Sequence, residues 1–163
     1  MILREPANAL DPRVRAVWTA EGLAATLVLA ALVAAATLIT AAAGSSTAAW
    51  VVGVAGGTLV VLAAVAAVVR PRVDYRRSRY EVMELGLYVT HGWLWRRWQV
   101  IPHARVQTVD TTAGPLLRAF GLVSVEVRTA SAAGSTSVPG LRPEVADALV
   151  EELARRAGIE EGT

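Results

Sequence analysis

Residues 22–69 read GLAATLVLAALVAAATLITAAAGSSTAAWVVGVAGGTLVVLAAVAAVV, and this stretch contains no charged residue. A helix needs roughly 20 apolar residues to cross the hydrocarbon core of a bilayer. The stretch is long enough for two spans, and Gly44-Ser45-Ser46-Thr47 supplies a turn, since glycine favours helix ends and Ser or Thr favours helix starts. We therefore predict transmembrane helices at 22–43 and 48–69 that form a tight hairpin.

The charges on either side of this hairpin predict its orientation. The turn between the spans is uncharged, whereas arginines lie before the first span and after the second, at Arg4, Arg13, Arg15, Arg70, Arg72, Arg76, Arg77 and Arg79. An excess of basic residues marks the cytoplasmic side of membrane proteins. We expect a multi-pass protein of the bacterial cytoplasmic (inner) membrane with both termini in the cytoplasm. The bacterial assignment follows from a composition rich in Ala, Gly and Val, with arginine as the only strongly basic residue type.

Two other interpretations of the apolar segment are disfavoured. Ala41–Ala43 resembles a signal-peptidase site, but the apolar run before it exceeds the roughly 7–15 residues of a signal peptide. The spans contain threonines but no ionisable residue, and ion or proton pathways usually need such groups. We therefore expect neither a cleaved leader nor a channel formed by this hairpin alone.

Gly53 and Gly57 have the spacing that lets transmembrane helices approach closely. The favoured interpretation is packing between the two helices of this chain. The alternative is that this face docks another membrane helix.

The remaining sequence predicts a β-rich domain. Pro71 is expected to end the second helix. Alternating apolar residues then predict strands, most clearly at Val123–Thr129, and a helical stripe of apolar residues follows from Pro143 to Gly158. The expected strands lie near residues 80–82, 87–90, 93–101, 106–109, 123–129 and 135–138. The expected regions are an N-terminal segment 1–21, the hairpin 22–69, a basic linker 70–79, the domain 80–158 and a tail 159–163.

Residues 79–157 resemble the bacterial pleckstrin-homology-like (PH-like) domain of YdbS-type membrane proteins. The similar motifs, in order, are Arg79-Tyr80-Glu81-Val82, Gly86-Leu87, Gly92, Val100-Ile101-Pro102, Arg105-Val106-Gln107-Thr108-Val109-Asp110, Pro115–Leu122 and Val125-Glu126-Val127-Arg128-Thr129. Leu10-Asp11-Pro12-Arg13 and the paired spans also look like that family. The resemblance implies an α+β protein: a two-helix transmembrane hairpin followed by a PH-like antiparallel β-barrel capped by a C-terminal α-helix. It implies little about a reaction.

Arginines near the membrane are the first candidate site. Anionic lipid attracts such groups at about 1 kcal/mol each. Arg70 and Arg72 are best explained as a topology signal. For the others, lipid binding and solvated surface charge are both open, namely at Arg76, Arg77, Arg79, Arg96 and Arg97.

A second candidate site concerns a protein partner. Trp93 and Trp95 are predicted to share one face of a strand and Trp98 the other, and at least one of the three is expected in the core. Arg105, Asp110 and Arg118 are most simply structural, fixing turns or ion pairs. The alternative is a partner-binding edge that includes Trp93, Trp95, Arg105, Arg118 and Phe120.

Several classes of chemistry lack a signature in this sequence. There is no cysteine, and His91 and His103 are expected to be exposed turn residues rather than metal ligands. No nucleotide-binding loop or nucleophile motif occurs, and a net charge of +2 does not favour nucleic acid. We therefore expect no cofactor, metal, small-molecule substrate or catalysis.

The favoured function is a non-enzymatic membrane-anchored module that binds a protein partner, an anionic lipid or both at the cytoplasmic face. The partner is expected to be a membrane protein or a second copy of the chain. The alternative is an accessory subunit of a larger membrane complex, docked through its transmembrane helices.

Overall fold

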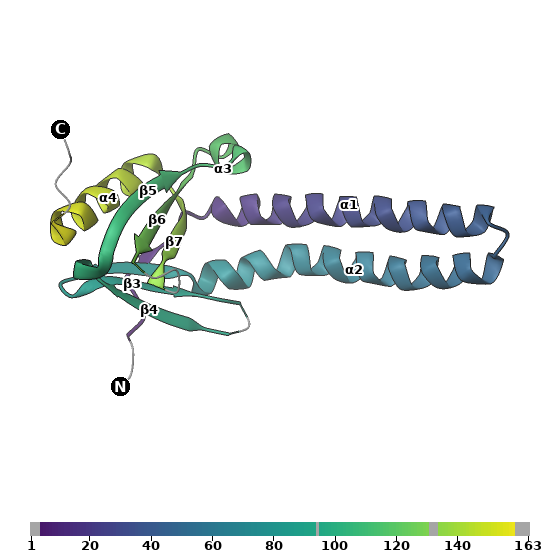
Figure 1. The fold of residues 1–163 in the computed structure, drawn as a ribbon, viewed down its shortest axis with the longest axis horizontal. Helices are drawn as coiled ribbons and strands as arrows, with labels where there is room; N and C mark the ends of the chain where they lie inside the picture. The colour runs from purple at the N-terminus through teal and green to yellow at the C-terminus, as the bar shows by residue number, and fades with distance from the viewer. Residues whose placement is uncertain (1–3, 94, 131–133, 159–163) are drawn as a thin grey trace. The chain divides into compact units, whose positions relative to one another are not determined.

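The computed structural model describes residues 4–93, 95–130 and 134–158, and the chain forms two compact units (Figure 1). One unit, Trp18–Arg72, is a helical hairpin. The other, Met1–Val17 with Val73–Thr163, is a domain rich in β-strands. The tail expected at 159–163 lies outside the described residues.

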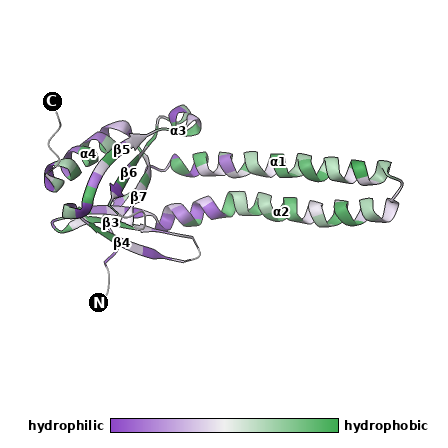
Figure 2. Ribbon diagram, viewed as in Figure 1, coloured by the Kyte–Doolittle hydropathy of each residue, from purple (hydrophilic) through white to green (hydrophobic). Residues whose placement is uncertain are grey.

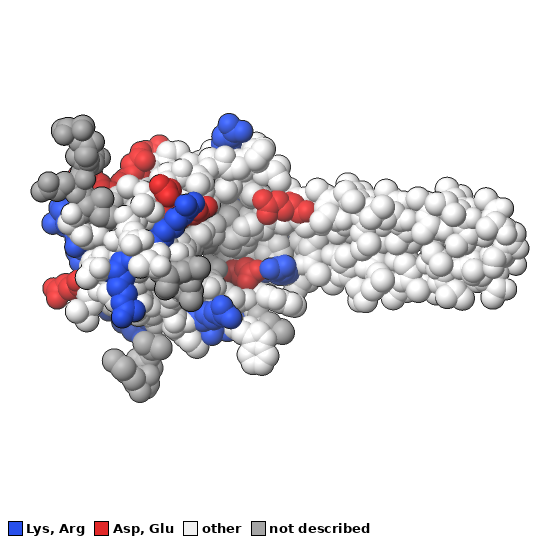
Figure 3. Space-filling model, in the orientation of Figure 1, with Lys and Arg blue, Asp and Glu red and all other residues white. Residues whose placement is uncertain are grey.

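Two long helices form the hairpin, α1 (Val14–Ala42) and α2 (Ser46–Arg77). Both are long and apolar enough to cross a membrane. Their large apolar side chains, such as Leu27, Leu38 and Trp50, are mostly exposed. Figure 2 shows that hydrophobic residues predominate along most of both helices, and the face seen in Figure 3 carries no charged side chain along most of the hairpin. Exposed apolar surface on this scale is stable in lipid rather than in water.

Small residues let the two helices of the hairpin pack closely, and its threonine hydroxyls are hydrogen-bonded within their own helices. A methyl group added to Gly22 would overlap Ala67 of the facing helix, and one added to Gly56 would overlap Val33. The threonine hydroxyls donate to backbone carbonyls one turn earlier in their own helices, at Thr26, Thr37, Thr40 and Thr58. No threonine hydroxyl in the spans is therefore left unpaired in lipid.

Helix α2 continues through Pro71 to Arg77, so the expectation that it ends near Pro71 is wrong. Proline removes the backbone donor that would pair with the Ala67 carbonyl. In the next position, the Arg72 guanidinium donates to the Val68 carbonyl at 2.5 Å. Beyond Pro71, the Tyr75 ring lies 4.9 Å from the Arg15 guanidinium carbon, a cation–π contact that fixes this end of α2.

The domain contains two antiparallel sheets. The first has the order β1 (Asn8–Ala9), β2 (Arg79–Met83), β3 (Gly86–His91) and β4 (Arg97–Pro102); the second has the order β5 (Val106–Thr112), β6 (Val123–Thr129) and β7 (Thr136–Leu141). Short helices η1 (His103–Arg105) and α3 (Pro115–Ala119) flank β5, and α4 (Pro143–Ala157) follows β7. Within the described residues β4 and β5 do not pair, so the PH-like domain is two packed sheets rather than a closed barrel.

The core lies between the inner faces of the two sheets and α4. Leu87 of β3, Val125 of β6 and Leu153 of α4 are fully buried. The alternation predicted for Val123–Thr129 and the apolar stripe predicted after Pro143 are therefore both confirmed. The helix α4 ends at Gly158, as predicted.

Asp11 and Gly140 fix the start of α1 against the domain through hydrogen bonds and close packing. The Asp11 carboxylate accepts a hydrogen bond from the Arg13 backbone N–H at 2.9 Å, which confirms it as a helix cap. The Asp11 backbone N–H donates to the Gly140 carbonyl at 3.0 Å. Gly140 has φ +68°, and a Cβ there would overlap Val14. Glycine at this position therefore allows the helix start to lie directly against β7.

Candidate membrane-contact site

The loop between β3 and β4 is built around Gly92. His91 and Arg97 form the last cross-strand pair, so the described residues Gly92, Trp93, Trp95 and Arg96 lie outside both strands. Gly92 has φ +115°, and a Cβ there would overlap the Trp95 carbonyl. The chain therefore turns here, and the prediction that Trp93 and Trp95 belong to a strand is wrong.

Three tryptophans are exposed on and beside this loop. Trp93 is 43% exposed, Trp95 80% and Trp98 44%. The expectation that at least one of them is a core residue is therefore wrong, since the turn carries two of them away from the sheet and Trp98 starts an edge strand. We call Trp93, Trp95, Arg96, Arg97 and Trp98 the tryptophan turn.

The tryptophan turn is fixed to the end of α2. The Arg77 guanidinium donates a hydrogen bond to the Trp93 carbonyl. The hydroxyl of Thr90, near the end of β3, donates to the Arg77 carbonyl at 3.1 Å. Arg77, the last residue of α2, is thus a positioning residue: it connects the end of this helix to the tryptophan turn.

The arginines predicted to bind lipid differ in their surroundings. Arg96 forms a 2.8 Å ion pair with Glu5, and both side chains are well exposed. Arg76 and Arg97 are exposed and Arg79 is half-buried, and none of them has an ion pair within the described ranges. An exposed ion pair such as Glu5–Arg96 contributes about 0.2–1 kcal/mol, so an anionic ligand can compete with it.

His91 sits at the base of the tryptophan turn between charges of both signs. Burial lowers the pKa of His91 below its usual value, the neighbouring Arg97 lowers it further, and Asp74 opposes the shift. His91 is therefore neutral at pH 7, and it adds no positive charge beside Arg97.

Sequence reasoning missed the acidic residues of this site. Glu5 reaches Arg96 across 91 positions of the chain, because the N-terminal residues run along β2. Glu81 of β2 accepts from the Ala7 backbone N–H at 3.1 Å and pairs with Arg4, which holds this segment in place. No local signal in the sequence could have identified these contacts, because they depend on strand pairing.

The residues predicted to bind a protein partner divide between two places. Trp93 and Trp95 belong to the tryptophan turn. Arg105 lies in η1, directly before β5, and Arg118 lies in α3, after β5, with Phe120 half-buried at the end of α3. Asp110, which was expected to be structural, forms an ion pair with Arg128 of β6 at 3.7 Å.

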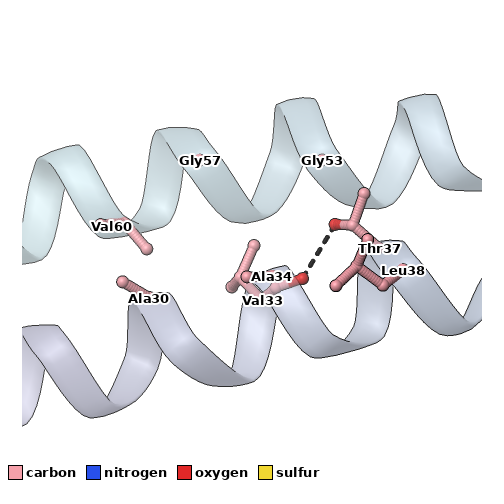
Figure 4. Close-up of a pocket in the computed structure, with 8 residues that line it drawn as sticks. All are labelled: Ala30, Val33, Ala34, Thr37, Leu38, Gly53, Gly57 and Val60. Carbon is pink, nitrogen blue, oxygen red and sulfur yellow. Dashed lines mark hydrogen bonds between the residues drawn. The ribbon is translucent and has the colours of Figure 1, made fainter.

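Gly53 and Gly57 line an open apolar groove of about 480 Å³ on the hairpin. The other lining residues are Ala30, Val33, Ala34, Thr37, Leu38 and Val60 (Figure 4). A Cβ added at Gly53 would lie 3.6 Å from the Thr37 methyl group, an ordinary van der Waals contact, and one added at Gly57 would meet open space. Close packing between the two helices therefore requires glycine at neither position.

The histidines do not form a metal site with any carboxylate cluster in the described chain. His103 is buried, and its Nε2 lies 2.9 Å from the Met83 carbonyl. The expectation of an exposed turn histidine is therefore wrong for His103, which is held in η1 by this hydrogen bond.

Comparison with known proteins agrees with this architecture. The model of the family described as "Bacterial PH domain" matches residues 15–157, which include both long helices. The chain belongs to the bacterial PH domain family. It is also 29% identical over 155 residues to the UPF0699 transmembrane protein YdbS of Bacillus subtilis (strain 168), covering 95% of each chain. No solved structure shows significant similarity.

Proposed function

We propose that this bacterial PH domain protein is a non-enzymatic, membrane-anchored module whose domain contacts anionic lipid through the tryptophan turn. The hairpin fixes the chain in the inner membrane with both termini in the cytoplasm. The domain then meets the cytoplasmic leaflet, where anionic lipids concentrate.

The observation that carries the proposal is the exposure of three tryptophans together with two exposed arginines, Arg76 and Arg97, that have no ion pair among the described residues. Trp95 is 80% exposed, which is costly in water for so large an apolar ring. Tryptophan favours the membrane interface, where its ring is shielded and its N–H stays hydrated. Arg97 and Arg76 add charges that attract lipid phosphates.

Chain length supports a position of the turn near the membrane. Arg77, which holds Trp93, lies only seven residues after Arg70, the first charge following the second span. Seven helical residues extend about 10 Å, slightly more than the roughly 5–8 Å of the headgroup region on each side of a bilayer. The short chain distance between Arg70 and Arg77 therefore supports contact of the exposed tryptophans with lipid.

The experiment that tests this proposal is quenching of tryptophan fluorescence by brominated lipid. The full chain is placed in nanodiscs of brominated phosphatidylglycerol or brominated phosphatidylcholine, in a Trp18→Phe/Trp50→Phe background that removes the two hairpin tryptophans. We expect strong quenching in the anionic discs that falls when Arg76, Arg96 and Arg97 are changed to Gln. Equal quenching by both lipids would refute the role of anionic charge, and no quenching in either would refute membrane contact.

A second candidate function is that of a subunit docked through its membrane helices. The open groove at Gly57 favours it, because a Cβ at Gly57 would meet open space and Ala30 and Ala34 also line the groove, so another helix could approach closely there. Gly57→Ile would then abolish co-purification of a stoichiometric membrane partner, whereas Leu27→Ile, on the lipid-exposed surface, would not. Co-purification that survives Gly57→Ile would exclude this groove.

A further inference from the structure

The strand β5 has one unpaired edge. It lies at the end of its sheet and pairs only with β6. Within the described ranges, no backbone hydrogen bond joins its other edge to a further element. An open edge presents a row of backbone donors and acceptors that a further strand can pair with.

The accessible part of this edge is regular and uncovered. The only register shift in the β5–β6 pairing is between Val106 and Thr108, and pairing is continuous from Thr108 to Thr112. Asp110, Thr111 and Thr112 are all exposed, although neighbouring residues of a strand point to opposite faces. Side chains on both faces of β5 are thus exposed over its second half, although α4 also contacts this strand.

The charges around this edge favour one kind of partner segment over others. Asp110 and Glu126 both lie within ion-pair distance of Arg128, at 3.7 and 3.3 Å, so Arg128 balances one of these two acidic charges and the other remains in the middle of the strand, away from its ends. Arg105 precedes the strand and Arg118 lies in the short helix toward which the strand points (Figure 1). Both are exposed, and neither has an ion pair in the described part of the chain.

We propose that β5 is a strand-addition site for an extended segment of a partner protein, with Asp or Glu near the ends of that segment. The added segment pairs with Thr108–Thr112, and its carboxylates meet Arg105 and Arg118. Backbone hydrogen bonds supply affinity in this mode of recognition, and charges at the ends supply selectivity.

A second copy of this chain fits the edge less well. Antiparallel pairing of two β5 strands places Arg105 of one copy beside Arg118 of the other, and parallel pairing places each arginine beside its own equivalent. Like charges oppose both arrangements. The occupant is therefore a different, acidic segment, and this inference does not depend on lipid contact by the tryptophan turn.

The test uses a defined peptide and the full chain in phosphatidylcholine nanodiscs, which contain no anionic lipid. The probe is a capped, fluorescent heptapeptide of alternating valine and threonine between two aspartates, titrated to millimolar concentration by anisotropy. One matched peptide carries lysine at both ends, and another carries N-methyl groups on alternate backbone nitrogens. We expect the aspartate peptide to bind about tenfold more tightly than the lysine peptide, and the N-methylated peptide to lose binding.

Variants and hydrogen exchange locate the binding. Arg105→Gln/Arg118→Gln removes the preference for aspartate ends, whereas Arg13→Gln, at another exposed arginine without a described ion pair, retains it. Backbone amides of β5 gain protection from exchange only with the unmethylated aspartate peptide. Absence of binding, equal affinity for both end charges, or protection confined to β4 or β7 would overturn the proposal. Unchanged protection of β6 in the double variant shows that it is folded.

Discussion

Single residues decide how the start of α1 packs within the domain and how the tryptophan turn is held. Gly140 permits the start of α1 to lie against β7, and Gly92 permits the chain to reverse before Trp93. Arg77 then ties that turn to the end of α2. Each of these contacts can be tested by one substitution.

Gly140→Ala is expected to destabilise the domain by about 2–4 kcal/mol. The new methyl group would overlap Val14, and alanine would be forced to φ +68°. The measurement is the urea midpoint of the detergent-solubilised chain. Gly121→Ala is the matched control, because Gly121 has φ +66° but open space at the Cβ position, so only about 1 kcal/mol is expected. Equal losses in the two variants would contradict the role of close packing.

His91 is expected to make the base of the tryptophan turn sensitive to acid. Its pKa in the folded chain lies below the usual 6.5, so the unfolded chain binds the proton more readily. The stability that His91 contributes is complete above about pH 6.5 and is lost as the pH falls through the folded pKa. NMR titration of the imidazole gives the pKa directly, and a value above 6.5 would contradict the assignment. His91→Gln should remove this part of the pH dependence.

Elements with a strong periodic pattern were predictable from sequence, and irregular ones were not. The strand Val123–Thr129 and the helix after Pro143 follow their apolar periodicity because one face of each is buried. The course of α2 beyond Pro71 and the loop at Gly92 depend on tertiary contacts such as Arg15–Tyr75, which periodicity does not encode. The same holds for the candidate site. Its arginines and tryptophans could be identified from the sequence, but the contact of Glu5 with Arg96 could not.

The helix α4 is expected to be essential to the stability of the PH-like domain. Leu153 on its inner face is fully buried, so Leu153→Ala should cost about 2–5 kcal/mol through lost burial and the cavity left behind. Leu85→Ala is the control, because Leu85 is highly exposed and should change stability by less than about 0.5 kcal/mol. Thermal unfolding followed by circular dichroism compares the two variants, and similar losses would refute the placement of α4.

At the scale of the whole molecule, we propose that an apolar hairpin anchors a domain that contacts the leaflet and a partner at once. Confinement to the membrane raises the effective concentration of both ligands, so individually weak contacts suffice. The tryptophan turn and the β5 edge use different strands, so lipid contact and partner binding need not compete.

The proposed topology predicts which residues are accessible from each side of the cell membrane. The chain has no cysteine, so single-cysteine variants can be labelled cleanly. Ser45→Cys, between the helices, should react with an impermeant maleimide added outside spheroplasts, whereas Thr111→Cys in β5 should react only after lysis. Labelling of Thr111→Cys in intact spheroplasts would show the opposite orientation.

The most direct test of the central claim is the depth of the tryptophan turn in the membrane. A nitroxide is attached at Trp95→Cys and, separately, at Leu85→Cys, because residues 85 and 95 lie beyond opposite ends of β3. Electron paramagnetic resonance in phosphatidylglycerol nanodiscs measures the collision of each label with oxygen, which concentrates in lipid, and with a water-soluble nickel chelate. We predict that the label at position 95 favours oxygen while the label at position 85 favours the chelate. Equal and complete access of both labels to the chelate would contradict membrane contact by the tryptophan turn.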